Sequence, residues 1–171
     1  EQEPHEVVTY QELYVRVNET AALLRDFAGL NTGDRVTIHM PMSTDLPVVM
    51  LACARLGVVH SVVFGGFSGK ACGERIADSG SSILITTDGY YRNGKMLDHK
   101  VKADEAVKVA SDAGQIVEKV LVWRRYPDTY QSEVPMKSGR DFFMDEHFPE
   151  FSGVRVDPVE LDADAPLFLM Y

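Results

Sequence analysis

Residues 58–76 constrain the fold of this chain more than any other stretch, because they read as a strand, a sharp turn and a helix in immediate succession. The strand part is rich in valine and ends in phenylalanine, which suits a buried strand. Gly65 and Gly66 follow at once, and Ser68 is placed to cap a helix that starts near Gly69. In an open parallel sheet, ligands bind beside such turns, where a helix amino end also favours negative charge. The alternative is a tight turn without a ligand, since the stretch lacks the Gly-x-Gly-x-x-Gly dinucleotide pattern.

The same alternation of strands and helices extends along the chain. Apolar runs rich in β-branched residues predict strands, and stretches with apolar residues at helical spacing lie between them. The first helix is predicted to begin at a capping box, in which the Glu12 side chain reaches back to Thr9, and to end at Gly29. This alternation predicts an α/β fold, with a parallel sheet, helices on both faces and right-handed crossovers. The predicted strands are 35–40, 58–64, 82–86, 119–123 and 166–171.

The length of 171 residues fits one domain, which we divide by pattern. Residues 1–8 are predicted to be a loose N-terminal segment, and 9–124 the strand–helix core, including a polar loop at 88–95. Residues 125–165 are an irregular connection with a short helix near 141–147, and 166–171 start a further strand. Because that apolar strand needs neighbours on both faces, we expect the chain to be a truncated piece of a larger domain.

Charge excludes several classes of partner. The formal net charge is −9, which argues against general nucleic-acid binding and against docking on an anionic membrane. We expect no membrane span and no secretory signal segment, because no apolar run is long enough and the start is polar and acidic. One window, 92–125, is basic, with eight Lys and Arg against five Asp and Glu. Such a window either meets phosphate or forms a solvated helix face.

The cysteines and histidines carry no sign of a metal site. Cys53 and Cys72 lie inside predicted helices and form no Cys-x-x-Cys pair. This usage is typical of small buried residues in a reducing compartment, so we expect a cytoplasmic protein. The five histidines are scattered, with no His-x-x-x-His spacing and no His/Cys cluster, and we assign no metal ligand.

Four runs of the chain, 33–42, 51–68, 75–79 and 85–95, strongly resemble AMP-forming acetyl-CoA synthetases of the adenylate-forming superfamily. Within them, the run Phe64-Gly-Gly-Phe-Ser68 is specific to the short-chain acyl-CoA synthetases. The likeness extends at lower density to Tyr171. The resemblance implies that residues 1–171 are part of the N-terminal large domain of such an enzyme, within a Rossmann-like subdomain of the adenylate-forming fold.

The resemblance also implies the chemistry. Enzymes of this kind join a carboxylate to ATP, with Mg²⁺, to give an acyl-adenylate and pyrophosphate, and CoA then takes the acyl group and releases AMP. Acetate, ATP and CoA are the expected small-molecule partners. In the family, a Ser/Thr/Gly-rich loop that holds the ATP phosphates follows the position of Tyr171. The ATP, Mg²⁺ and acyl sites therefore belong outside this chain, and we assign no catalytic residue and no metal ligand within it.

What the resemblance assigns to this chain is part of the CoA site. The family's Phe-Gly-Gly turn lies against the adenine end of CoA, and an Arg-x-x-Arg loop after the next strand contacts the CoA phosphates. The second cation of that loop is lysine here, a point charge that cannot make the forked contact of a guanidinium. The alternative for both cations is a solvated position on a loop. The expected CoA-binding residues are Phe64, Gly65, Gly66, Arg92, Asn93, Gly94 and Lys95.

Other functions stay open at this point. A propionyl-type short-chain acyl-CoA synthetase shares the same segments, because the acid pocket lies elsewhere. A free-standing Rossmann-like module for a nucleotide or CoA is a second alternative. A nicotinamide-dependent oxidoreductase is disfavoured, because the first strand–helix turn, at 40–44, is not the glycine-rich turn that binds a pyrophosphate. If the chain is part of an acetyl-CoA synthetase, we expect it to be inactive by itself.

Overall fold

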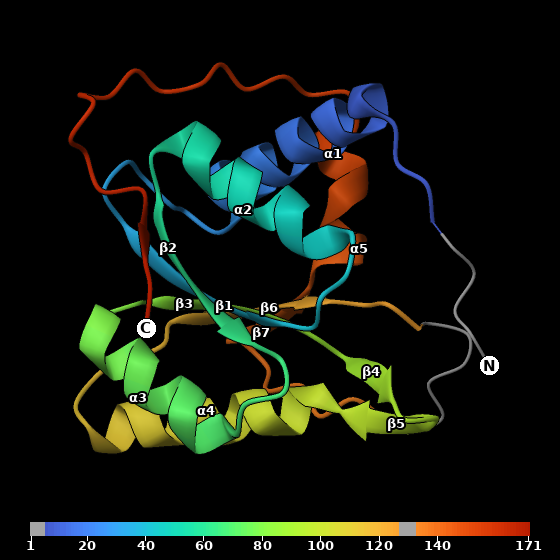
Figure 1. Cartoon of the computed structure of the whole chain (residues 1–171), viewed down its shortest axis with the longest axis vertical. Coiled ribbons are helices and arrows are strands. Elements are labelled where there is room, and N and C mark those ends of the chain that lie inside the picture. Colours follow the sequence, from blue (N-terminus) through green and yellow to red (C-terminus); the bar gives the residue numbers. More distant parts are fainter. Residues whose placement is uncertain (1–5, 127–132) are drawn as a thin grey trace.

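The centre of the fold is a six-stranded sheet in which every pair of neighbours is parallel (Figure 1). The computed structural model describes residues 6–126 and 133–171. The strand order is β7-β6-β3-β1-β2-β8. The strands are β1 (Arg35–Met40), β2 (Val59–Phe64), β3 (Ile83–Thr87), β6 (Lys119–Trp123), β7 (Asp141–Phe143) and β8 (Phe168–Leu169). The predicted α/β class and parallel sheet are confirmed.

Helices cover both faces of this sheet, and the strands bury side chains on both faces. In β3, Ile83 and Ile85 join one apolar core while Leu84 between them joins the other, as the two-residue period of a strand requires. Figure 1 shows α1, α2 and α5 on one face and α3 and α4 on the other. The helices are α1 (Tyr10–Ala22), α2 (Asp45–Leu56), α3 (Gly69–Ser79), α4 (His99–Asp112) and α5 (Met144–His147).

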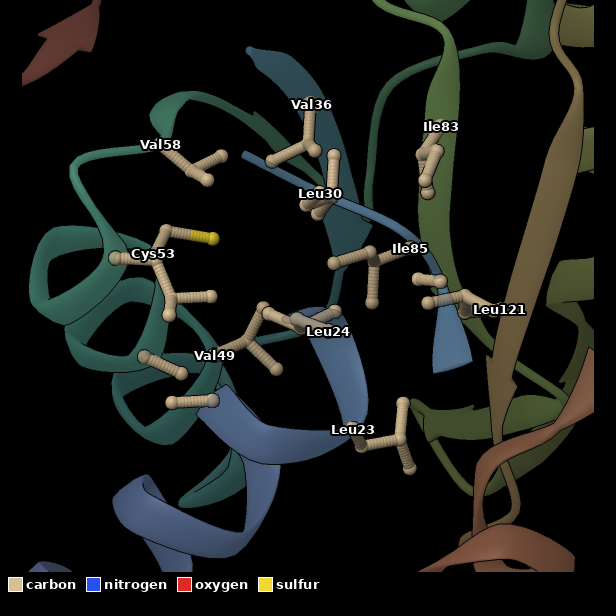
Figure 2. Packing of buried hydrophobic residues seen from close by; sticks show 14 of the residues in the cluster. Leu23, Leu24, Leu30, Val36, Val49, Cys53, Val58, Ile83, Ile85 and Leu121 are labelled. Atoms are coloured by element: carbon tan, nitrogen blue, oxygen red, sulfur yellow. The ribbon is translucent and has the colours of Figure 1, made fainter. Parts of the chain in front are cut away.

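The larger core lies between α1, α2 and the sheet. Figure 2 shows Leu24, Val49 and Cys53 from the helical layer pointing toward Ile85 and Leu121 of the strands. All five are fully buried, and burial raises the pKa of the Cys53 thiol to about 12. Both cysteines are free and buried, which confirms their interpretation as small core residues.

The ends of the first helix follow the sequence signals. The Thr9 side chain accepts a hydrogen bond from the Glu12 amide, and the Glu12 carboxylate accepts one from the Thr9 amide, so the predicted capping box is present. After α1, the helix continues as a π-helical turn, η1 (Leu23–Phe27), and Gly29 then takes a positive φ of 83°. Glycine adopts this conformation without the steric penalty that other residues incur.

The polar loop expected at 88–95 is wrong, because these residues form most of an antiparallel hairpin. Its strands are β4 (Gly89–Arg92) and β5 (Lys95–Asp98). Asn93 and Gly94 have φ values of 52° and 74°, the left-handed pair that a type I′ hairpin turn requires.

The C-terminal third differs from expectation in smaller ways. The helix expected near 141–147 is a strand, β7, followed by the single-turn helix α5, and a 3₁₀ helix, η2 (Phe148–Phe151), follows it. The further strand expected over 166–171 is β8, which pairs only at Phe168 and Leu169 with β2. Residues 1–5 of the predicted loose segment and 127–132 of the predicted irregular connection lie outside the described residues. None of the helices in 6–126 and 133–171 has the length and apolar character needed to cross a membrane.

A network of four charges, two of them fully buried, ties α4 to the chain that leads into β7. The Lys100 Nζ atom lies 2.8 Å from a carboxylate oxygen of Asp104 and 2.8 Å from one of Asp141, and it donates to the Pro135 carbonyl at 2.7 Å. Arg140 pairs with the same two carboxylates. The Lys100 and Asp141 side chains have no exposed surface. Because buried charges are costly unless paired, this network fixes the position of β7 at the sheet edge.

This network makes stability depend on pH in one direction. Burial alone raises the pKa of Asp141, but hydrogen bonds from Arg140 and Lys100 outweigh burial and hold the pKa below its usual 3.8. A carboxylate with a depressed pKa in the folded state contributes stability above its unfolded pKa, and that contribution is lost as pH falls through the folded value. We therefore expect the difference in unfolding free energy between the wild type and Asp141→Asn to be constant above about pH 5 and to shrink as the pH falls from there to about pH 2. Urea denaturation across this range measures it, and a constant difference would contradict the expectation.

Candidate functional site

The turn after β2 lies at the carboxyl edge of the sheet and leads directly into α3. The Gly65 amide donates to the Met40 carbonyl at 3.0 Å, so pairing with β1 continues one residue beyond the strand. The chain then reverses, with the Phe67 amide donating to the Phe64 carbonyl at 2.9 Å. The Ser68 hydroxyl accepts from the Ala71 amide at 3.2 Å, which confirms Ser68 as the helix cap.

Neighbouring groups pack closely against both glycines of this turn, but only Gly65 meets backbone atoms. A Cβ atom on Gly65 would lie 2.9 Å from the Pro41 backbone nitrogen and 3.1 Å from the Met40 carbonyl. These are backbone atoms, and moving them would distort the end of β1. A Cβ on Gly66 would lie 2.5 Å from the Phe64 ring and 3.2 Å from Arg92 Nη1. Among the described residues, neither glycine appears with a positive φ. Their function in the fold is therefore to let neighbouring groups approach, rather than to supply an unusual backbone angle.

Two side chains converge on the carbonyl oxygen of Gly65. The Tyr90 hydroxyl donates to it at 3.0 Å and the Lys102 ammonium at 3.2 Å. Tyr90 is buried, with 8 % of its surface exposed, and Lys102 comes from the first turns of α4. The carbonyl has two lone pairs, so it can accept both hydrogen bonds. The turn is thus held from the hairpin and from α4 at once.

The hairpin carries the two predicted loop cations to the same place. Arg92 and Lys95 are directly opposite each other in the β4–β5 register, on either side of the Asn93-Gly94 turn. The guanidinium of Arg92 is exposed and lies beside Gly66, close enough that it would touch a Cβ there. Lys95, Asn93 and Gly94 are exposed as well. The structure therefore brings Arg92 to the glycine turn and places Lys95 next to Arg92.

The two loops do not follow adjacent strands, because β1 lies between β2 and β3 in the sheet. They come together through side chains of β4, because the Tyr90 hydroxyl donates to the Gly65 carbonyl and the Arg92 guanidinium lies near Gly66.

Within the described part of the chain, the site combines cations that have no carboxylate partner with an exposed aromatic surface. Among the described residues, no carboxylate forms an ion pair with Arg92, Lys95 or Lys102, whereas neighbouring Lys100 and Lys108 on α4 are both paired. Phe64 is 49 % exposed and its ring meets that of Phe67 edge to face, with centroids 6.3 Å apart. Unpaired cations beside an exposed aromatic ring can receive a phosphate-bearing ligand with a planar base.

Two buried histidines support the Tyr90 ring. The ring of His99 lies 5.2 Å from that of Tyr90 and 4.3 Å from that of His39, and its Nε2 donates to the His39 carbonyl at 2.9 Å. Burial, together with the neighbouring His99 and Lys102, lowers the pKa of His39 to about 3. Burial lowers the pKa of His99 to about 4. Both rings are neutral at pH 7, so the positive charge of the site comes from its exposed cations.

Sequence reasoning missed Tyr90 and Lys102 as parts of this site. The Asn93-Gly94 dipeptide between short apolar stretches is a strong hairpin signal and would have placed Tyr90 on a strand. Lys102 has no such signal, because its contact with Gly65 joins residues 37 positions apart. No group of three or more His, Cys, Asp or Glu side chains suited to a metal ion occurs in the described part of the chain.

The chain is similar to known enzymes along nearly its whole length. A model of the family described as AMP-binding enzyme matches residues 2–171. The 3-hydroxypropionyl-coenzyme A synthetase of Sulfurisphaera tokodaii is 44 % identical over 165 residues, which cover 96 % of this chain and 24 % of that protein. The acetyl-coenzyme A synthetase of Rhizobium rhizogenes is 45 % identical over 166 residues, with the same two coverages.

A solved structure agrees with the fold. The acetoacetyl-CoA synthetase from Streptomyces lividans superposes with a TM-score of 0.74 at 25 % identity, covering 97 % of this chain and 24 % of that one. The present chain thus spans about a quarter of the length of the curated relatives it matches.

Proposed function

Because this chain belongs to the family of AMP-binding enzymes, we propose that it is the CoA-binding part of a short-chain acyl-CoA synthetase. In the proposed reaction, a carboxylate attacks the α-phosphorus of ATP to give an acyl-adenylate and pyrophosphate. The thiol of CoA then attacks the acyl carbon, and AMP leaves. In this reading the ATP and Mg²⁺ sites lie in the part of the enzyme outside this chain, and the location is cytoplasmic.

The observation that carries this proposal is the contact between the hairpin and the glycine turn. Arg92 lies against Gly66, which places a guanidinium beside the exposed Phe64 ring. A guanidinium makes two charge-assisted hydrogen bonds to one phosphate, and an aromatic ring supplies a face for an adenine. CoA carries both groups. Lys95, on the opposite strand of the hairpin, adds a second, less directional charge.

Asn93 and Gly94 enter this proposal as the residues that shape the hairpin. Their left-handed conformations close the two-residue turn and leave Arg92 and Lys95 facing each other across it. Their exposed backbone is also free to meet a phosphate. Gly65 and Gly66 shape the glycine turn. Because they have no side chains, the turn packs closely against Pro41 and Phe64, and this leaves room for the ligand to approach.

Acetate is the acyl donor we propose, with 3-hydroxypropionate and propionate as the alternatives. Relatives of nearly equal identity are named for acetate and for 3-hydroxypropionate. The test is thioester formation by the longer enzyme that contains this chain, with each acid supplied in turn together with ATP and CoA. Formation of acetyl-CoA supports the proposal, and a strong preference for another acid would replace acetate. No CoA-dependent thioester from any short acid would refute it and favour a separate binding module.

The chain of 171 residues alone is expected to form no acyl-adenylate. It spans about a quarter of its relatives, and the described residues include no group that we can assign to ATP or to the carboxylate. Acetate-dependent exchange of labelled pyrophosphate into ATP should therefore stay at the blank with this purified chain. Exchange clearly above the blank, from material free of longer enzyme, would show that the adenylation site has been misplaced.

A further inference from the structure

Lys102 and Arg92 approach neighbouring residues of the glycine turn. The Lys102 Nζ atom is 3.2 Å from the Gly65 carbonyl oxygen, while the Arg92 guanidinium lies against the adjacent Gly66. The two cations therefore lie near consecutive residues, and one comes from α4 and the other from the hairpin.

The Gly65 carbonyl does not need Lys102 as a donor. Tyr90 already donates to the same oxygen at 3.0 Å from a buried position. An ammonium has three donor hydrogens, and the contact with Gly65 uses one of them. No carboxylate in the described part of the chain pairs with Lys102, and its other recorded contact is with the face of the Tyr90 ring, 5.8 Å from the centroid. Two donors of this charged, partly buried group thus have no partner among the described residues.

We propose that Lys102 is a third phosphate-binding cation, which holds the Gly65 carbonyl and a phosphate oxygen of CoA at the same time. The inference rests on the proposed function and extends it to a residue on another element. A single ammonium shared between the turn and the ligand would also couple the position of the turn to occupancy of the site. Lys102 would then fix both the ligand and the carbonyl against which the ligand lies.

The test is the Lys102→Met variant of the longer enzyme that contains this chain. Methionine keeps most of the apolar stem over Tyr90 and removes the charge. We expect the KM for CoA to rise about tenfold, which is the loss of one charge-assisted hydrogen bond at a wet site. Pyrophosphate exchange, which needs no CoA, should not change. Lys102→Arg should recover much of the CoA affinity. Lys108→Met, which removes an exposed lysine paired with Asp112 on the same helix, is the matched control and should match the wild type.

Tyr90→Phe separates phosphate binding from a purely structural role. It removes the other hydrogen bond to the same Gly65 oxygen without changing the charge. Screening by salt weakens interactions between charges, so the KM for CoA should rise less steeply with ionic strength in Lys102→Met than in the wild type. Tyr90→Phe should keep the wild-type dependence. The proposal is overturned if Lys102→Met leaves the KM unchanged, or raises it only as Tyr90→Phe does with an unaltered salt dependence.

The KM for 3′-dephospho-CoA shows which phosphate of CoA Lys102 binds. If Lys102 binds the ribose 3′-phosphate, its removal leaves the KM for 3′-dephospho-CoA unchanged. If it binds the diphosphate, the KM values for CoA and 3′-dephospho-CoA rise alike, and both depend less steeply on ionic strength than in the wild type. A wild-type enzyme that forms thioester normally while Lys102→Met is indistinguishable from it contradicts this inference alone. A wild-type enzyme without CoA-dependent turnover contradicts the proposed function and, with it, the inference.

Discussion

Replacing Lys100 by methionine is expected to lower the free energy of unfolding by about 3 kcal/mol. The Lys100 side chain is fully buried and lies against two carboxylates and a carbonyl, so its removal leaves Asp104 and Asp141 with Arg140 as their shared cation. Removal of one partner from a buried ion pair costs about 3–5 kcal/mol, and the low end applies because Arg140 still pairs with Asp141. Urea denaturation of the chain measures the loss, which should also lower Tm by about 6–12 °C.

Two variants control this prediction. Lys100→Met combined with Asp141→Leu removes one charge of each sign and should be more stable than Lys100→Met alone, because buried pairs can be replaced by apolar side chains at little cost. Lys108→Met removes an exposed lysine that forms the same kind of i,i+4 pair, with Asp112, and should leave stability almost unchanged. If Lys100→Met costs no more than Lys108→Met, the network does not hold β7 in place.

The central strands could be predicted because they are buried on both faces. In 35–40 and 119–123, apolar runs bounded by turn residues coincide with β1 and β6 in the structure. Strands of this kind can be predicted from the local sequence alone. β7 was missed for the opposite reason. Its first residue, Asp141, is a buried charge whose partners, Lys100 and Arg140, are visible only after folding. The sequence there predicted a short helix near 141–147 instead of a strand.

The candidate site was likewise predictable only in part from the sequence. Phe64, Gly65, Gly66, Arg92 and Lys95 were named from a resemblance, and the structure brings Arg92 to the glycine turn. The path by which it does so was not predictable from strand adjacency, because β1 intervenes and side chains of β4 make the contact. Lys102 depends on how closely α4 packs against α3, and the spacing of residues in the sequence contains no information on that distance.

Arg92→Ala is expected to raise the KM for CoA about ten- to thirtyfold in the longer enzyme. A hydrogen bond to a charged group is strong, and each tenfold step in affinity is about 1.4 kcal/mol, but the guanidinium is exposed and solvent screens part of the contact. Lys95→Ala should raise the KM less, because an ammonium lacks the forked geometry of arginine. The acyl-adenylate forms before CoA reacts, so the first half-reaction should not depend on either cation.

The most direct test of the CoA-site assignment is a paired assay on one preparation of Arg92→Ala. Carboxylate-dependent exchange of pyrophosphate into ATP reports the first half-reaction, and thioester formation at varied CoA reports the second. The account predicts exchange near the wild-type rate together with a CoA KM raised about ten- to thirtyfold. An unchanged dependence on CoA, or exchange that falls as far as thioester formation does, would contradict the placement of CoA between the glycine turn and the hairpin.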